Sequence, residues 1–409
     1  MRFERRTVWT VAAAAYVVGV FHRSSMAVAG LDAADRFGIG PATLSAFVAM
    51  QVVVYAAMQI PAGTLVEAIG PRWSLVLGSA AMGAGQFGFA EAESVPAAIA
   101  ARVMVGCGDA LIFICVLRLI ASWYPESSVA WMNQATGLVG QVGALVAAVP
   151  MTAALAHLGW ADTYRVAGLT GLVVAMVVMM LVRDGPIGLD PVIPRRREAG
   201  LLRATARVPE VRLGFWIHGA MSFSSITFML IWGHPFLVEA ERVSEATAGA
   251  LISCGAAGLM AGSIIMGRLA PTGAHHRLTL VQSVIVAQVV MWSAVLLWPG
   301  RSPLVVLTVF TFLLGMCTPA SFLGFDAARS AVGARGAALA IAVVNQGGFV
   351  LAVVLIVSIG AVVQLAQQTA FAPGAAYSLA MLAQFPIWIW ASYRIRSLGL
   401  DVAALERDN

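Results

Sequence analysis

The sequence predicts an all-α integral membrane protein, with twelve transmembrane helices arranged in two six-helix bundles. Hydrophobic residues make up 60% of the chain and charged residues only 11%, whereas soluble globular proteins carry roughly 25% charged residues. Runs of about 20 apolar residues, enough to cross ~30 Å of hydrocarbon, recur along the whole sequence. The longest hydrophilic break lies midway, between Arg183 and Arg212. These three observations together exclude an ordinary soluble domain.

The twelve predicted spans follow one another with short loops, six on each side of the central break. The N-terminal bundle is expected over 1–183, a basic cytoplasmic linker over 184–212 and the C-terminal bundle over 213–409. Two related halves with a substrate site at their interface are a recurring plan of secondary transporters. The spans are expected at about 8–31, 42–66, 73–92, 96–123, 129–157, 164–182, 213–238, 246–269, 278–298, 304–325, 336–364 and 376–394.

The arginines predict the orientation of the chain in the membrane. All 25 basic residues are arginine, and if both termini are cytoplasmic, only Arg36, Arg165, Arg242 and Arg301 fall in outside loops. This distribution satisfies the positive-inside rule. The net charge of +5 therefore reflects topology and gives no support for a nucleic-acid partner. We expect a monomeric, multi-pass protein of the cytoplasmic (inner) membrane of a bacterium.

The sequence offers no pattern typical of an enzyme or a metal site. The four cysteines lie within predicted spans, where disulfides are not expected, and no His/Cys spacing indicates a metal. No glycine loop of the Walker A type is present to bind ATP. We therefore predict neither a cofactor nor a metal, and no catalytic activity.

Helix one carries the most informative residue, Arg23. A guanidinium at bilayer depth costs about 2.5–3.5 kcal/mol on the mildest insertion scale, so Arg23 should face water, a counter-ion or a substrate. Tyr16 shares its face of the helix by the 3.6-residue period, and His22 lies about 100° away. We expect Tyr16, His22 and Arg23 to bind substrate, with His22 as a possible second proton site because histidine titrates near neutral pH. Two alternatives stay open: Arg23 only neutralises Asp109, and His22 is only a hydrogen-bonded structural residue.

Helix four carries a base and an acid on one face. Arg102, Gly106 and Asp109 recur at i, i+4 and i+7. Burial and a nearby guanidinium act on a carboxyl group in opposite directions, so Asp109 is able to change its charge when its access to water changes. We expect Asp109 to carry the proton, controlled by Arg102. The alternative is a permanent Arg102–Asp109 ion pair that only stabilises the helix.

Several other spans carry isolated polar side chains that are candidates for substrate contact. Amides and hydroxyls can bind the hydroxyl groups of a substrate, but they also hold membrane helices together, and serine bonds readily to its own helix backbone. The candidates are Tyr55 on helix two, Gln134 on helix five, His218 and Ser222 on helix seven, and Asn345 on helix eleven.

Two short segments resemble a known family. GTLVEAIGPR (63–72) resembles the loop signature of the major facilitator superfamily, with Gly63, Glu67, Gly70 and Arg72 at matching positions and Ala68 in place of the usual middle base. RVMVGCG (102–108) is similar to the fourth-helix motif of the same superfamily. The resemblance implies its twelve-helix fold, a cavity lined mainly by helices one, four, seven and ten, and a conformational role for the four signature residues.

A narrower resemblance suggests the substrate class. Arg23, Tyr55, Arg102 and Asp109 match residue by residue the anion:cation symporters, which couple organic anions to protons, while His22 stands where those proteins carry an acid. The resemblance implies a proton-coupled symporter of a small organic anion, such as a monocarboxylate or a sugar acid, that works by alternating access. Two alternatives are a proton-antiport exporter of drugs or siderophores and a transport-dead membrane sensor or assembly partner.

Overall fold

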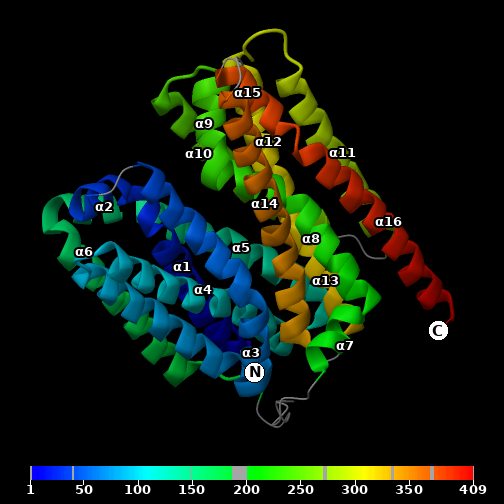
Figure 1. Cartoon of the computed structure of the whole chain (residues 1–409). Helices are drawn as coiled ribbons and strands as arrows, with labels where there is room; N and C mark the ends of the chain where they lie inside the picture. The colour runs from blue at the N-terminus through cyan, green and yellow to red at the C-terminus, as the bar shows by residue number, and fades with distance from the viewer. Residues whose placement is uncertain are drawn as a thin grey trace. The chain divides into compact units, whose positions relative to one another are not determined.

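The computed structural model is built from helices (Figure 1). It describes residues 2–38, 41–148, 150–186, 200–269, 274–332, 336–368 and 373–408, and every regular element in these ranges is a helix. Residues 187–199 of the expected linker lie outside the described residues. The chain divides into two compact units, which are described separately: unit 1 comprises Met1–Thr205 and Val332–Ala342, and unit 2 comprises Ala206–Ala331 and Val343–Asn409.

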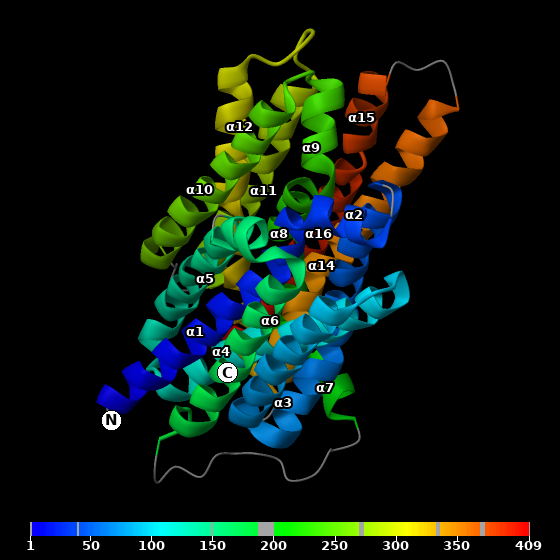
Figure 2. The ribbon, with the colours of Figure 1, turned by 90° about the vertical axis from the view of Figure 1, so that its left-hand side faces the viewer.

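Unit 1 contains the first six helices and most of the seventh. In it α3 packs extensively along α4 and α6, and α1 lies against α4, α5 and α6; the ribbon can be followed from blue to green in Figure 2. The helices are α1 (Arg2–Val28), α2 (Gly30–Phe37), α3 (Pro41–Glu91), α4 (Val95–Trp123), α5 (Glu126–Ala148), α6 (Pro150–Leu181) and α7 (Leu201–Arg207).

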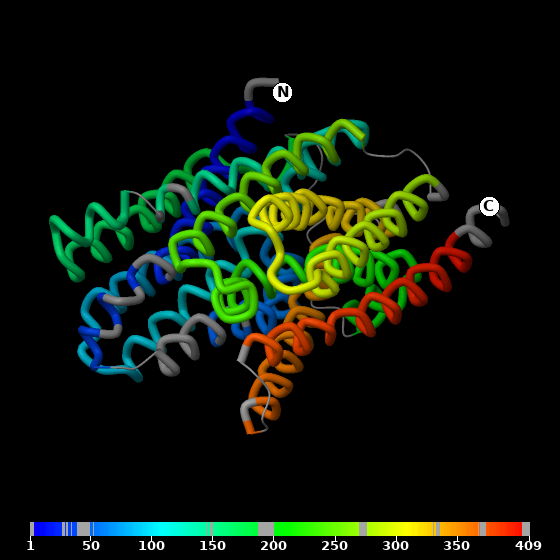
Figure 3. The backbone as a smooth tube through the Cα atoms, turned by 90° about the horizontal axis from the view of Figure 1, so that it is seen from above, coloured from blue at the N-terminus to red at the C-terminus, as the bar shows by residue number. Residues whose placement is uncertain are grey.

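Unit 2 holds most of the remaining helices, and the tube in Figure 3 traces them from green to red. The stretch that begins with α8 continues without a break through two π-helical segments. The elements are α8 (Pro209–Thr227), η1 (Phe228–Trp232), α9 (Gly233–Pro235), η2 (Phe236–Ala240), α10 (Glu245–Leu269), α11 (Ala274–Leu296), α12 (Leu304–Cys317), η3 (Thr318–Ser321), α13 (Phe322–Ala331), α14 (Ala337–Gln367), α15 (Pro373–Met381) and α16 (Gln384–Asp408).

Eight helical stretches among the described residues are long and apolar enough to cross a membrane. One of them, Val53–Glu91 in α3, covers two of the predicted spans, because Gly70 turns the chain inside a continuous run of helix. α1, which carries His22 and Arg23 in its second half, is not among the eight. Length and composition alone therefore undercount spans that carry polar and charged residues or contain a glycine turn.

Proline and glycine move two of the predicted boundaries. The fifth span was expected to be one helix over 129–157, but α5 ends at Ala148 and Pro150 begins α6. Proline has no N–H to continue a helix and fits best in a first turn. Gly159, at φ 74°, then turns the chain inside α6. The last expected span, 376–394, likewise falls on the separate helices α15 and α16.

Glycine allows the close approach of α3 and α4. A Cβ added to Gly78 would lie 2.9 Å from the carbonyl oxygen of Gly108, and one added to Gly108 would lie 2.5 Å from the carbonyl oxygen of Gly78. Small residues at such crossings are typical of membrane helices, which gain little from hydrophobic burial in lipid and rely on backbone proximity. This crossing fixes the position of α4, which carries Arg102 and Asp109.

An aromatic cluster forms part of the core of unit 2. The rings of Trp292 and Phe310 have centroids 4.7 Å apart, and Phe228 lies 5.7 Å from Trp292 and 5.5 Å from Phe310. The Trp292 indole donates to Ser224 Oγ at 3.0 Å, and Ser224 donates to Gln384 Oε1 at 2.8 Å. Aromatic contacts and these two hydrogen bonds thereby connect α8, α11, α12 and α16.

Gly70 makes a testable contribution to stability. It adopts φ 84° and ψ 160°, a region that costs other residues about 1–3 kcal/mol, and an added Cβ would lie 3.0 Å from an Asp184 carboxylate oxygen. Gly70→Ala is therefore expected to lower the thermal unfolding temperature in detergent. Gly159→Ala is the control: its φ is also positive, but its Cβ would meet no atom within 4 Å. A Gly70→Ala effect no larger than that of Gly159→Ala would contradict the crowding argument.

Candidate functional site

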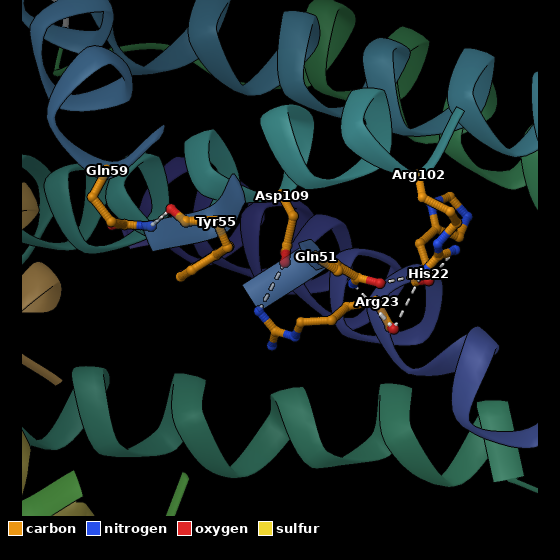
Figure 4. Close-up of polar contacts among 7 residues, drawn as sticks. All are labelled: His22, Arg23, Gln51, Tyr55, Gln59, Arg102 and Asp109. Carbon is orange, nitrogen blue, oxygen red and sulfur yellow. Dashed lines mark hydrogen bonds and ion pairs between the residues drawn. The ribbon is translucent and has the colours of Figure 1, made fainter. Parts of the chain in front are cut away.

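The structure brings Arg23 and Asp109 together in an ion pair between α1 and α4. Nη1 of Arg23 lies 2.9 Å from Oδ2 of Asp109, and Figure 4 shows the two side chains pointing toward one another. The Asp109 side chain is only 2% exposed in the structure, whereas that of Arg23 is 34% exposed. The pair therefore has a covered acidic end and an accessible basic end.

Aromatic and small residues surround this ion pair. The Arg23 guanidinium lies 5.6 Å from the centroid of the Tyr55 ring, a cation–π distance. Tyr16 packs its ring 5.5 Å from that of Phe113. A Cβ added to Gly19, one turn before Arg23 on α1, would lie 3.7 Å from Asp109 Oδ1. Tyr16, Tyr55 and Arg23 thus belong to one region of unit 1.

Arg102 occupies a separate cluster, which we call the Arg102 cluster and define as Arg102, Gln51, Ser25 and the main-chain carbonyls of residues 22 and 23. Arg102 Nη2 donates to Gln51 Oε1, and Nη1 donates to Ser25 Oγ at 3.3 Å. The two guanidinium nitrogens also reach the two carbonyl oxygens, each at 3.5 Å. Asp109 is paired with Arg23 and not with Arg102, so the alternative of an ion pair along α4 is not what the structure contains.

Gln51 links this cluster back to α1. Its Oε1 accepts from Arg102, while its Nε2 donates to the carbonyl oxygen of Arg23 at 3.3 Å. Arg102 is 2% exposed and lies 5.3 Å from the centroid of the Phe89 ring. A buried guanidinium is thus held by amide, hydroxyl and carbonyl oxygens, and it fixes α1, α3 and α4 relative to one another.

His22 points away from the ion pair. Its ring is fully buried, and Nε2 lies 3.0 Å from the carbonyl oxygen of Ala167 and 3.3 Å from Thr170 Oγ1, both on α6. The sequence placed His22 beside Arg23 as a substrate-binding and proton-binding residue. Consecutive residues on a helix diverge by about 100°, and here that angle carries the ring to α6.

The superfamily-like signature lies at one end of unit 1, which we call the Gly70 end. Glu67 Oε1 accepts a hydrogen bond from the backbone N–H of Ala338, in the first turn of α14, at 2.7 Å. A carboxylate is favoured at a helix N-terminus by the helix dipole and the free N–H groups. Gly63 lies against the same turn, since an added Cβ would approach Ala342 Cβ to 2.6 Å and Ala338 O to 3.1 Å.

A second acid at the Gly70 end was not foreseen. Asp184, just after α6, accepts from the backbone N–H of Arg72 at 2.6 Å, and Arg72 Nη2 donates to the carbonyl of Met179 at 2.6 Å. Arg118 interacts electrostatically with both Glu67 and Asp184. Arg118, on α4, therefore belongs to the cluster of charges at the Gly70 end.

Partial burial raises the pKa of Asp184, although Arg72 and Arg118 act in the opposite direction. A carboxyl whose pKa is higher in the folded than in the unfolded chain binds protons more tightly when folded, so stability increases as pH falls toward the unfolded value of about 3.9. We expect Asp184→Asn, which keeps an acceptor for Arg72, to be at least as stable as wild type at pH 7. The difference in unfolding temperature should shrink as pH falls to 5; a gap that widens on acidification would contradict this assignment.

The remaining candidates lie in two places. Gln134 is buried on α5 in unit 1. In unit 2, His218 Nδ1 lies 3.4 Å from the carbonyl oxygen of Ser321, and Ser222 donates to the carbonyl of His218 at 2.5 Å. A Cβ added to Gly348 on α14 would meet both side chains at 2.6–3.0 Å, one helical turn from buried Asn345. His218, Ser222 and Asn345 thus share the region where α8 meets α14.

Sequence reasoning missed three members of these clusters. Gln51 lies one helical turn before Tyr55, and that spacing was the available signal for it. Ser25 gives no signal, because serine bonds readily to its own helix backbone and needs no other partner. Asp184 directly follows a predicted span, and that position next to the signature loop was the available clue.

Comparison with known proteins identifies the family. The model of the Major Facilitator Superfamily matches residues 8–385. Among curated proteins, the chain is similar to the "Probable L-galactonate transporter" of Escherichia coli (strain K12), with 24% identity over 170 residues. That alignment covers 42% of this chain and 38% of the relative, so it spans well under half of the relative's length.

Two solved structures share the fold. One is FucP, a transporter of the superfamily in its outward conformation, with a TM-score of 0.66, 15% identity and coverage of 94% of this chain and 98% of FucP. The other is a bacterial homolog of the human lysosomal transporter Spinster, in an inward-facing and unoccupied conformation, with a TM-score of 0.61, 15% identity and 97% coverage of both chains. The family match over most of the chain and these fold neighbours confirm the predicted fold: the chain belongs to the Major Facilitator Superfamily and is a multi-pass membrane transporter rather than an enzyme.

Proposed function

We propose that this transporter is a proton-coupled symporter of a small organic anion, a monocarboxylate or a sugar acid, and that it works by alternating access. The observation that carries the proposal is the Arg23–Asp109 ion pair, with its covered carboxylate and its accessible guanidinium. The similarity of part of the chain to a probable L-galactonate transporter supports a sugar acid as the substrate.

The chemistry of the pair provides a coupling mechanism. A guanidinium offers a planar fork that matches a carboxylate, and Arg23 uses Nη1 for Asp109. A proton on Asp109 neutralises the carboxylate that pairs with Arg23. The guanidinium is then free to donate hydrogen bonds to the carboxylate of the substrate. Substrate binding and protonation of Asp109 therefore favour one another, which is the thermodynamic requirement for symport.

The other polar candidates predicted from the sequence are proposed to bind the rest of the substrate. Tyr16 and Tyr55 flank the ion pair in unit 1, and Gln134 lies on α5 of the same unit. In unit 2, His218, Ser222 and Asn345 supply an imidazole, a hydroxyl and an amide. These groups suit a polyhydroxylated acid, whose hydroxyls need both donors and acceptors.

Arg102 is proposed to support coupling from within unit 1. Its bonds to two α1 carbonyls hold the segment that carries Arg23, so a movement of α1 is transmitted to α4. Gly63, Glu67, Gly70 and Arg72 are proposed to stabilise one conformation through the N-terminus of α14. The proposed setting is the inner membrane of a bacterium, with both termini cytoplasmic and the protein monomeric.

The test uses the full chain reconstituted in lipid vesicles with an imposed pH gradient. A panel of organic anions, with L-galactonate among them, is scored first by thermal stabilisation of the purified protein and then by uptake. Acid-outside vesicles should accumulate at least one monocarboxylate or sugar acid above its external concentration. If the panel gives no accumulation under a pH gradient, while cationic drugs are moved in exchange for protons, the symport proposal is wrong.

A further inference from the structure

The imidazole of His22 is bound as a neutral donor. Thr170 Oγ1 donates its own hydrogen to the carbonyl of Ala167 at 2.7 Å, so both oxygens near His22 Nε2 act toward it as acceptors. Nε2 therefore carries the ring hydrogen. Nδ1 is buried and has no hydrogen-bond partner among the described residues. An imidazolium would place a second N–H at that position, where the described part of the chain offers no acceptor.

The charge around His22 also disfavours a second proton. The elements packed against its segment contribute Arg102 from α4, the phenol of Tyr164 from α6 near Arg102 and Ser25, and the neutral amide of Gln86 from α3, which donates to the His22 carbonyl at 3.4 Å. Arg102 is already a buried cation whose described hydrogen bonds go to neutral oxygens. Another positive charge beside it would lack compensation.

Asp109 has a different environment. The charged and titratable groups around it are Arg23, Arg102 and Tyr16. Protonation of Asp109 breaks its ion pair with Arg23. The Arg23 guanidinium is then left without a counter-ion, and the negatively charged substrate takes that place. Of the two candidate proton sites in this region, only Asp109 has a partner that changes with substrate binding.

The charges of the site balance with one proton and one monovalent anion. In the empty site Arg23 and Arg102 contribute two positive charges and ionised Asp109 one negative charge, which leaves one net positive charge. In the loaded site Asp109 is neutral and the substrate carboxylate supplies the negative charge, so the net charge is again one. The proton and the anion that cross together carry no net charge. A second proton that His22 bound only in the loaded state would add one positive charge to each transport event.

We propose that transport is electroneutral, with one proton for each monovalent anion, and that His22 acts as an uncharged tether between α1 and α6. This inference rests on the proposed symport, and it adds the coupling ratio and the insensitivity to membrane potential. A neutral imidazole gives α6 a hydrogen bond without offering a second proton.

The experiment measures steady-state accumulation of the panel anion with the highest pH-driven uptake, L-galactonate being the first one tried, in vesicles whose potential is set by a potassium gradient and valinomycin. One proton per anion limits accumulation to about tenfold for each pH unit, and potential should not change it. Two protons would allow about a hundredfold per pH unit. The extra positive charge would then let an inside-negative potential raise accumulation by about a further fiftyfold per 100 mV. Accumulation that rises with inside-negative potential would overturn the inference.

Variants separate the role of His22 from the function itself. His22→Gln keeps a side-chain N–H donor but cannot titrate, so the coupling ratio and the insensitivity to potential should match wild type, whatever the effect on rate. His157→Gln is the matched control on an exposed surface of α6. A His22→Gln protein that loses potential-driven accumulation present in wild type would show that His22 carries a proton. Absence of any pH-driven uptake would instead remove the symport proposal, and this inference with it.

Discussion

Asp109→Asn should abolish accumulation of substrate against its gradient and leave exchange of substrate across the vesicle membrane. Asparagine keeps the shape and the acceptor oxygen that Arg23 contacts at 2.9 Å in wild type, but it cannot take up a proton. With no proton coupled to the anion, the steady-state ratio across a membrane held at zero potential falls from about tenfold per pH unit to one. The variant is therefore expected to lose pH-driven accumulation while still exchanging substrate across the membrane.

The measurement compares pH-driven uptake with counterflow in the same vesicle preparation. Asp162→Asn is the matched control, because Asp162 also pairs with an arginine at 2.9 Å but is 62% exposed; its accumulation should equal that of wild type. If Asp109→Asn vesicles still concentrate substrate under a pH gradient, another group carries the proton and the role given to Asp109 is wrong.

Arg23→Ala is expected to produce the largest combined loss of binding and stability. A charge-assisted hydrogen bond contributes about 1.5–3 kcal/mol, so substrate affinity should fall by about 10–150-fold. The variant also leaves Asp109, 2% exposed, without its counter-ion; breaking a buried pair in this way costs about 3–5 kcal/mol. Binding is followed by thermal shift or calorimetry, and stability by thermal unfolding in detergent at pH 7.

Two comparisons isolate these effects. Arg165→Ala removes an arginine that is 47% exposed and paired at the surface, where a pair contributes ~0–1 kcal/mol, so it should change little. Arg23→Met combined with Asp109→Leu removes both charges and should recover most of the stability but none of the transport. If Arg23→Ala binds and unfolds like wild type, the ion pair has neither proposed role.

The fold was predictable because the bilayer itself determines two features of the sequence. Its thickness determines the length of the apolar runs, and the positive-inside rule determines which loops carry the arginines. Local chemistry moved the boundaries, since Pro150 begins a new helix where one long span was expected, and Gly70 turns the chain inside α3. The π-helical segments after α8 have no periodic signal in the sequence.

The site was predictable to the level of helix faces. A charge is costly in lipid, so Arg23 and Asp109 could be assigned to the protein interior, and the structure pairs them. Partners across helices depend on rotation and register, which the sequence does not specify. For that reason the partners of Arg102 are Gln51 and main-chain oxygens rather than Asp109, and His22 faces α6.

The most direct test of competition between Asp109 and substrate for Arg23 is the pH dependence of L-galactonate affinity in purified protein. If the substrate binds only when Asp109 is protonated, the dissociation constant of wild type should rise about tenfold for each pH unit above the pH at which Asp109 loses its proton, and Asp109→Asn should show no such slope. A wild-type affinity that is constant between pH 5 and 9, or a slope that persists in Asp109→Asn, would contradict the account.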